Sequence, residues 1–222
     1  MSENLVDAVL FDYGGVLTNP LREVVRDWHA ADGIEPESFT AVLRQWLSRT
    51  VRWATPIHRL ETGELAAEEF EHLLAAELRT LDGTPVEPAG LLSRMFAQMS
   101  PDDTMFELAA GLKRCGVRVG LLSNSWAHTY PRERIDALFD PVVISGEIGL
   151  RKPQAQIYQH AVDRMGVPAR RTLFVDDAEI NIIGARASGL RGLQHLNPRC
   201  TRAALSALVP DLSAALQVAT AS

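Results

Sequence analysis

Residues 6–15 read VDAVLFDYGG and decide how the rest of the chain is interpreted. The run from Val6 to Phe11 is apolar except for Asp7, as in a strand that lies inside a sheet. Gly14 and Gly15 form a turn signal that ends the run. Asp12 stands between the apolar run and the turn. The stretch therefore predicts a buried strand with a carboxylate at its carboxyl end.

The second half of the chain alternates apolar strands with helical segments. Strands are predicted over residues 117–122, 142–144 and 172–175, with a last short one through Leu193. Helices are predicted over 131–139, 153–165 and 179–188, and an earlier one ends at Cys115, with Ser100 as its N-cap and Pro101 at its first position. This alternation favours right-handed crossovers and a parallel sheet that helices cover on both faces.

From residue 17 to residue 99 the apolar residues follow a helical period instead. Phe39, Val42, Leu43, Trp46 and Leu47 show it, and Gly63 and the segment 82–85 interrupt it. The chain is thus predicted to be α/β, with a Rossmann-like core of residues 1–16 and 101–222 and an all-helical domain of residues 17–100. The tryptophans of that domain are predicted to belong to its core: Trp28, Trp46 and Trp53.

Composition excludes several classes of protein. The 222 residues carry 22 Lys and Arg against 28 Asp and Glu, a net charge of -6, which argues against a generally basic nucleic-acid binder. No apolar run approaches the length that spans a bilayer, and the first residues lack the basic region of a secretion signal. Two cysteines, Cys115 and Cys200, favour a reducing cytoplasm. We expect a cytoplasmic protein without nucleic-acid or membrane partners; monomer and homodimer both remain open.

Polar residues follow the predicted strands at the points where they end. Asp12 follows the first, Ser123 and Asn124 the second, and Asp176 with Asp177 the strand over 172–175, while Lys152 lies just ahead of a helix. Ligands of open α/β sheets bind at the carboxyl ends of the strands. We therefore expect these side chains to converge on one edge of the sheet.

The converging residue types suit phosphoryl chemistry. Three carboxylates at one edge repel each other unless a cation neutralises them, and hard oxygen ligands favour Mg²⁺. Lys152 adds a fixed positive charge, and Ser123 with the amides around Asn124 adds donors. Such a site fits a dianionic phosphoryl group with one carboxylate free to attack, which leads to an aspartyl-phosphate intermediate.

The same residues resemble the four motifs of the haloacid dehalogenase-like hydrolases, in the family's order. These are FDYGGVLT from Phe11, LLSN ending at Asn124, GLRKPQAQIY around Lys152, and LFVDD ending at Asp177 and followed by Asn181, Gly184 and Gly189. The helical insertion is similar to the family's cap, as is the segment 60–64 within it. The chain most resembles the phosphatases that are similar to the N-terminal domain of soluble epoxide hydrolase.

The resemblance implies a role for each of these positions. Asp12 would be the nucleophile and a ligand of Mg²⁺, together with Asp177, Asp176 and the carbonyl of Gly14. Ser123 and the Asn124 amide would hold the phosphoryl oxygens of a small phosphorylated metabolite, and Lys152 would screen the nucleophile. Most family phosphatases carry a general-acid aspartate where this chain has Gly14, a loss that would cost roughly 10²–10⁴-fold for a poor leaving group.

Structural roles remain open beside the functional ones. Asp12 could form an Asx-turn, Ser123 to Ser125 a turn and helix cap, and Asp176 with Asp177 a cap for the next helix. Lys152 could be an exposed lysine, although this chain has only two lysines, Lys113 and Lys152, among its 22 cations. Thr18 and Arg151 could be solvated or contact substrate. The six histidines show no ligand spacing and are predicted to be surface or packing residues: His29, His58, His72, His128, His160 and His195.

Two rival functions follow from the same residues. The first is metal-independent hydrolysis of a carbon–halogen bond through an Asp12 ester, for which the acidic pair and the Gly14–Val16 segment are atypical. The second is a binding or regulatory protein that has lost turnover together with its general acid.

Overall fold

Five parallel strands form the central sheet, in the spatial order β3-β2-β1-β4-β5. The computed structural model describes residues 4–47, 54–127 and 130–219. The predicted Trp53 and His128 lie outside these residues. The strands are β1 (Ala8–Phe11), β2 (Arg118–Ser123), β3 (Val142–Ile144), β4 (Thr172–Asp176) and β5 (Arg191–Gln194).

Helices connect the strands and form the insertion between β1 and β2. The inserted ones are α1 (Leu21–Asp32), α2 (Pro36–Trp46), α3 (Pro56–Glu61), α4 (Ala67–Glu77) and α5 (Leu91–Met95). Those of the core are α6 (Asp103–Arg114), α7 (Arg132–Leu138), α8 (Ser145–Ile148), α9 (Ala155–Met165), the short 3₁₀ helix Ala169–Arg171, α10 (Glu179–Ala187), α11 (Pro198–Leu208) and α12 (Leu212–Ala219). The predicted Rossmann-like fold is confirmed.

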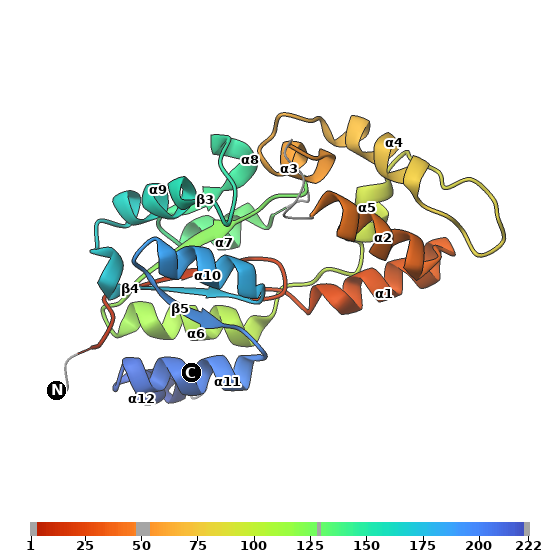
Figure 1. Ribbon diagram of the computed structural model, residues 1–222. Helices are drawn as coiled ribbons and strands as arrows, with labels where there is room; N and C mark the ends of the chain where they lie inside the picture. Colours follow the sequence, from red (N-terminus) through yellow and green to blue (C-terminus); the bar gives the residue numbers. More distant parts are fainter. Residues whose placement is uncertain (1–3, 48–53, 128–129, 220–222) are drawn as a thin grey trace.

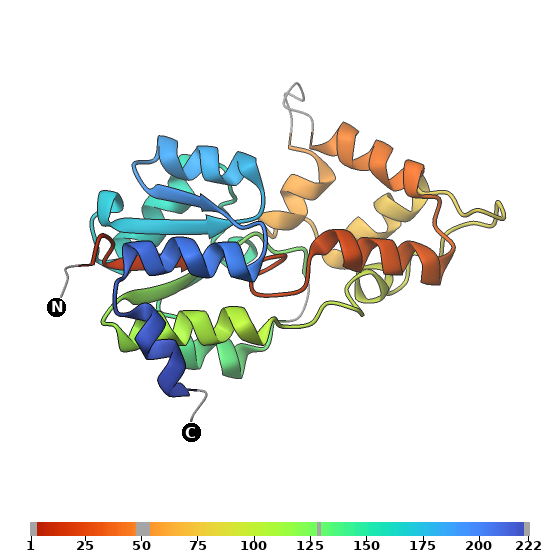
Figure 2. The same cartoon turned by 90° about the horizontal axis from the view of Figure 1, so that it is seen from below.

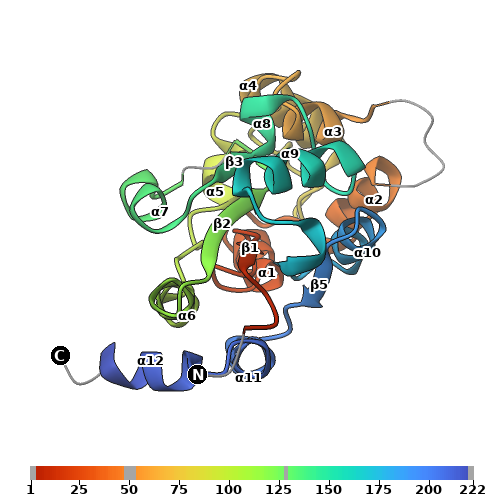
Figure 3. The same cartoon turned by 90° about the vertical axis from the view of Figure 1, so that its left-hand side faces the viewer.

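Alternate residues of each strand face the two helical layers, as the period of a strand requires. Val9 and Phe11 of β1 pack in one apolar cluster with residues of α6, α7, α11 and α12. Ala8 and Leu10 pack in another with residues of α9 and α10. Figure 3 shows α6, α11 and α12 on one side of the sheet and α9 with α10 on the other. Because both faces are covered, the strands are apolar almost throughout.

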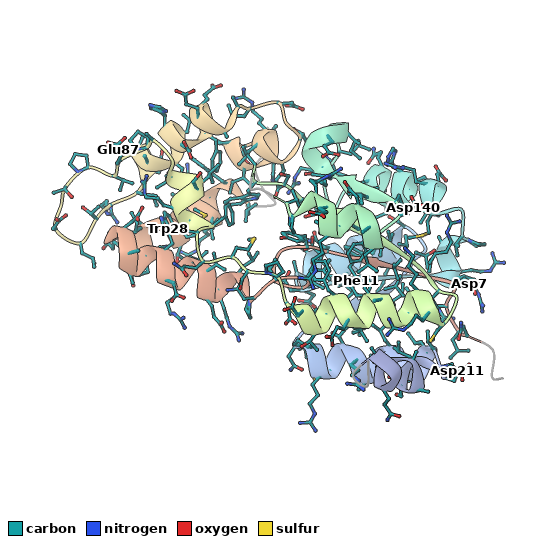
Figure 4. The ribbon with its side chains drawn as sticks, turned by 180° about the vertical axis from the view of Figure 1, so that it is seen from behind. Asp7, Phe11, Trp28, Glu87, Asp140 and Asp211 are labelled. Carbon is teal, nitrogen blue, oxygen red and sulfur yellow. The ribbon has the colours of Figure 1, made fainter. Side chains whose placement is uncertain are left out.

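The inserted helices form a second body with an apolar core of its own. That core includes Trp28, Phe39, Trp46 and Phe70, so Trp28 and Trp46 pack as predicted. Figures 1 and 2 show these helices, here called the cap, beside the sheet domain, which carries both chain ends. In the Figure 4 view, the labelled Phe11 lies toward the cap and Asp7 at the opposite end of β1. The carboxyl end of β1 therefore faces the cap.

Two linkers join the cap to the sheet domain and run side by side. Thr18 and Pro101 form an isolated antiparallel bridge, and the Asn19 N–H donates to the Ser100 carbonyl at 3.0 Å. The predicted boundaries between residues 16 and 17 and between 100 and 101 fall at these linkers and stay predictions.

The predicted start of α6 is wrong. The helix begins at Asp103, and its N-cap is Asp102, whose carboxylate accepts the N–H of Met105 at 3.2 Å. Ser100 belongs to the linker, where its N–H donates to Asn19 Oδ1 at 3.0 Å. Pairing of the linkers holds Ser100 outside the helix, and Asp102 caps it instead.

None of the described helices combines the length and apolar character that crossing a membrane requires.

Candidate active site

Lys152 lies at the centre of the candidate site, between two carboxylates. Its Nζ is 2.8 Å from Asp12 Oδ1 and 2.7 Å from Asp176 Oδ2. The Lys152 side chain is 1% exposed, so the alternative of an ordinary exposed lysine does not hold. Its burial is consistent with the predicted functional role. An ammonium this deeply buried is stable only because both acids compensate its charge.

The register of the sheet brings the acids together. Phe11 of β1 pairs with Val175 of β4, so Asp12 and Asp176 stand next to each other on neighbouring strands. The Asp12 N–H donates to the Val175 carbonyl at 2.9 Å, which continues the ladder to the nucleophile candidate. Asp12, Asp176 and Asp177 each offer an oxygen within 4.8 Å of the others. The three acids therefore converge at one sheet edge, as expected.

Asp176 is fully buried and held by donors on both of its oxygens. Oδ1 accepts the N–H of Ala178 at 2.8 Å and Oδ2 accepts Lys152, while Asn181 Nδ2 reaches both oxygens at 3.1 and 3.0 Å. The N-cap of α10 is Ala178, without a side-chain capping bond, so neither acid has the capping role proposed as an alternative. Asp176 is thus an anchor for Lys152.

Asp177 faces the turn that follows Asp12. A Cβ atom added to Gly15 would lie 2.5 Å from Asp177 Oδ2, and Gly15 has φ +75°. Only glycine fits both the backbone conformation and this close approach. The turn that carries the Gly14 carbonyl therefore lies against Asp177.

Electrostatics in the cluster favour an added cation. Burial raises the pKa of the Asp12 carboxyl to about 8, opposed by Lys152 and reinforced by Asp176 and Asp177. Burial also raises the pKa of Asp177 to about 6, and Asp176 adds to the effect. Burial alone would lower the pKa of Lys152, but the charges of Asp12 and Asp176 outweigh it and raise that pKa. When all three acids are ionised, one ammonium does not neutralise them, so a bound cation would favour their ionised forms.

This donor set fits the Mg²⁺ that the resemblance implies. Carboxylate and carbonyl oxygens are its preferred ligands, and Mg²⁺ keeps several waters when it binds. Asp12 and Asp177 are the candidates for direct ligation, since both Asp176 oxygens already accept protein donors. The Gly14 carbonyl and Asp176 stay predicted ligands.

Ser123 and Asn124 lie at the end of β2 but use their side chains differently. The Ser123 hydroxyl is buried and lies 3.0 Å from the Tyr130 hydroxyl. The Asn124 side chain accepts the Lys152 N–H at 2.9 Å and donates to the Lys152 carbonyl at 3.1 Å. Asn124 therefore joins the two loops, which leaves its backbone N–H as the predicted phosphate donor.

Gly14 is bordered by an apolar side chain instead of an acid. A Cβ atom there would meet Leu21 Cδ1 and Cδ2 at 3.5 Å, an ordinary contact. Thr18 is buried, and its hydroxyl accepts the Gly15 N–H at 2.9 Å, so it shapes the turn.

Two cavities lie between the cap and the sheet domain. The first, about 360 Å³, is lined by Tyr13, Ala67, Glu71, Leu92, Ser93, Phe96, Met99 and Ala127. The second, about 310 Å³, is lined by Leu60, Gly63, Leu65, Ala67, Ser125, Ala127, Tyr130, Ile144, Gly146 and Glu147. Tyr13, which lines the first cavity, directly follows Asp12 in the sequence, whereas the described residues that line the two cavities include neither Asp12 nor Lys152.

Residues 6–189 match the family model described as haloacid dehalogenase-like hydrolase. The chain belongs to this family. The resemblance that the four motifs suggested is confirmed, and the protein is a hydrolase.

Relatives and solved structures add detail about similar hydrolases. The chain is 29% identical over 206 residues to sesquiterpene phosphatase astK of Aspergillus oryzae, covering 91% of this chain and 96% of that protein. It is 30% identical over 196 residues to phosphatase MT3486 of Mycobacterium tuberculosis, covering 84% and 85%. A HAD family enzyme of Bacteroides thetaiotaomicron, solved with magnesium and inorganic phosphate, superposes with a TM-score of 0.61 at 20% identity, covering 85% and 93%. That structure is similar in fold.

Three contacts of the hydrolase's site were not predicted. Asn181, named in the fourth motif without a role, lies in the first turn of α10 and donates to both oxygens of Asp176 at the end of β4. Tyr130 beside Ser123 had no sequence signal. Arg151 is neither solvated nor free, because its guanidinium pairs with Glu61 of the cap.

Five of the six histidines lie in the described residues. His195 is buried, and its ring nitrogen lies 2.9 Å from the Thr201 hydroxyl, which is a packing role.

Proposed function

We propose that this hydrolase is a Mg²⁺-dependent phosphatase of a small phosphorylated metabolite, acting through an aspartyl-phosphate intermediate. The observation that carries the proposal is the buried Lys152, which bridges Asp12 and Asp176 beside Asp177. This arrangement offers a nucleophile, a fixed cation and oxygen ligands at one sheet edge, the components that phosphoryl transfer needs.

In the first step, the Asp12 carboxylate attacks phosphorus and the bond to the leaving oxygen breaks. Lys152, 2.8 Å from Asp12 Oδ1, reduces the repulsion between the carboxylate and a dianionic phosphoryl group. The Ser123 hydroxyl and the Asn124 N–H would donate to the phosphoryl oxygens. Mg²⁺, when bound by Asp12 and Asp177, supplies further neutralisation of charge on these oxygens.

In the second step, water attacks phosphorus, the bond between Asp12 and phosphorus breaks, and orthophosphate leaves. With glycine at position 14, the leaving oxygen takes its proton from solvent in the first step, and the attacking water releases its proton to solvent in the second. The proposal therefore favours leaving groups of low pKa, such as those of sugar 1-phosphates and acyl phosphates.

The leaving group would occupy the cavity beside Tyr13. Among the described residues that line the two cavities, the charged ones are the carboxylates Glu71 and Glu147. Negative charge there disfavours a leaving group with a second phosphate or a carboxylate, so we expect an uncharged one. The Aspergillus relative, a sesquiterpene phosphatase by name, supports a phosphatase with such a leaving group.

A substrate panel tests the proposal directly. Phosphate release is measured for sugar 1-phosphates, acyl phosphates, uncharged alkyl and aryl phosphates and nucleotides, each with Mg²⁺ and with a chelator. We expect metal-dependent release that favours uncharged leaving groups. Absence of metal-dependent release from every compound contradicts the phosphatase.

The glycine at position 14 favours one second candidate, a protein that binds a phosphorylated ligand without hydrolysing it. Calorimetry that shows tight Mg²⁺-dependent binding alongside zero turnover supports that candidate. Dehalogenation is tested by chloride release from 2-haloacids, which we expect to be absent because the acidic pair suits a metal-dependent reaction.

A further inference from the structure

Glu61 is a buried carboxylate of the cap whose side-chain hydrogen bonds, among the described residues, go to the sheet domain. Its side chain is 7% exposed, at the last residue of α3. Oε1 accepts the indole N–H of Trp126 at 3.0 Å, and Oε2 accepts Nε–H of Arg151. The Glu61 carbonyl accepts the Ser145 hydroxyl, whose oxygen accepts the Ser125 N–H at 2.9 Å.

The partners of Glu61 belong to the two loops that carry the site. Trp126 and Ser125 follow Ser123, and Arg151 directly precedes Lys152. From within the sheet domain, Asn124 already joins these loops through both backbone groups of Lys152. Glu61 joins the same loops a second time, from the cap.

Close packing between the cap and the sheet domain surrounds the contacts of Glu61. A Cβ atom at Gly63, which has φ +75°, would lie 2.7 Å from the Gly146 carbonyl oxygen, so the two backbones touch. The Phe70 ring of the cap lies 5.8 Å from the Trp126 ring. Arg151, with a side chain 13% exposed, would be a poorly compensated cation without the Glu61 carboxylate.

We propose that Glu61 is a positioning residue that aligns the Ser123–Ser125 and Arg151–Lys152 loops when the cap is closed. It touches neither Asp12 nor the phosphoryl donors among the described contacts, and acts through Trp126 and Arg151. The contacts of Glu61 thereby link the docked cap to the arrangement of Ser123 and Lys152. The catalytic part of this inference rests on the proposed phosphatase.

The cap supplies a matched control, Asp32. Its Oδ2 accepts the indole N–H of Trp28 at 3.1 Å and Nε–H of Arg94 at 2.6 Å, so it has the same two kinds of donor as Glu61. Both of its partners belong to the cap itself. Comparing Glu61→Gln with Asp32→Asn therefore separates an effect on the site from loss of a Trp–carboxylate–Arg contact.

The first test measures hydrogen exchange at the amides of Ser125 and Lys152 by NMR, which needs no turnover. Glu61→Gln and Arg151→Gln are expected to speed exchange at both amides about 10-fold or more, while Asp32→Asn leaves both unchanged. Unchanged exchange in folded Glu61→Gln and Arg151→Gln overturns the proposal, whether or not the protein is a phosphatase. Measuring Arg151→Gln keeps the test decisive if Glu61→Gln does not fold.

The second test uses the best substrate of the panel. We expect Glu61→Gln and Arg151→Gln each to lower kcat about 10–100-fold with a smaller change in KM, and the double variant to lose no more than the worse single one. Equal kcat in wild type, Glu61→Gln and Asp32→Asn overturns the positioning role. Faster exchange in the two variants, together with no turnover by the wild type on any compound of the panel, contradicts the phosphatase alone.

Discussion

The buried and half-buried carboxylates of the sheet domain and those of the cap are satisfied in different ways. In the cap, Asp32 lies between an indole and a guanidinium, and Glu71 accepts the backbone N–H groups of Gly90 and Leu92. In the sheet domain, Lys152 contacts Asp12 and Asp176, and Asp177 lies beside these two acids. Each cap carboxylate thus has donors of its own, whereas the sheet-domain cluster keeps negative charge that an added cation can neutralise.

The difference shows which buried acids are suited to chemistry. A carboxylate whose charge is fully compensated contributes to structure and has no reason to react. A cluster with uncompensated charge is destabilising unless it binds something, which is how functional sites commonly differ from structural ion pairs. The predictions below test this contrast, beginning with the largest effect.

Asp12→Asn is expected to lower turnover by at least about 10⁴-fold, because the amide cannot act as the nucleophile. The fold should persist, since asparagine keeps the shape and Asp176 still compensates Lys152. Phosphate release and circular dichroism measure the two effects. Retained turnover in the folded variant would show that Asp12 is not the nucleophile. The proposed difference between reactive sheet-domain acids and structural cap acids would then fail.

Gly14→Asp is expected to raise kcat about 10²–10⁴-fold for alkyl phosphates and less for acyl phosphates, because an added acid helps poor leaving groups most. The added Cβ meets only Leu21 at ordinary contact distance. Gly15→Ala in the same turn is the control. It should lose activity, since its Cβ would lie 2.5 Å from Asp177 Oδ2. A Gly14→Asp variant that gains nothing on either substrate class shows that the missing acid does not limit the rate.

Mg²⁺ is expected to stabilise the folded protein by about 2.7 kcal/mol at a concentration of 100 Kd, since it relieves repulsion among the three acids. Thermal unfolding with Mg²⁺ and with a chelator measures the shift. Asp177→Asn should reduce the shift, whereas Asp32→Asn should keep it. An equal shift in both variants would place the ion elsewhere.

Asp32→Ala is expected to lower the free energy of unfolding by about 1–3 kcal/mol, because it removes the carboxylate that accepts the Trp28 indole N–H and the Arg94 Nε–H. Urea unfolding measures the loss, and kcat should be unchanged. A fall in kcat without loss of stability would show that the cap carboxylate serves the reaction after all.

The smallest expected effect concerns His195. Burial lowers its pKa below 6.5, opposed by Asp102, so below about pH 6.5 the unfolded chain binds a proton that the folded chain does not. Stability conferred by the neutral ring is therefore present above that pH and falls as pH decreases. His195→Gln should remove this part of the pH dependence in urea unfolding. An identical pH dependence in wild type and variant contradicts the buried neutral ring.

The contrast also explains what the sequence could and could not predict. Asp12, Ser123 and Asp176 were predicted to meet because parallel strands of known order in the chain end at one sheet edge. Helices of the cap were predicted from the helical spacing of their apolar residues, such as Phe39, Val42 and Trp46, which pack in the cap core. Neither pattern predicts which cap residue meets which loop. The Glu61 contacts depend on how two bodies dock, and the N-cap of α6 depends on pairing between distant linkers, so both required the structure.

The most direct measurement of the central claim is chemical trapping of the intermediate during turnover. Borohydride reduces an aspartyl phosphate to homoserine, and peptide mass spectrometry locates the changed residue. The account predicts homoserine at position 12 in the presence of substrate and Mg²⁺, and none with the chelator. Steady phosphate release with an unmodified Asp12, or with the change at another carboxylate, would contradict it.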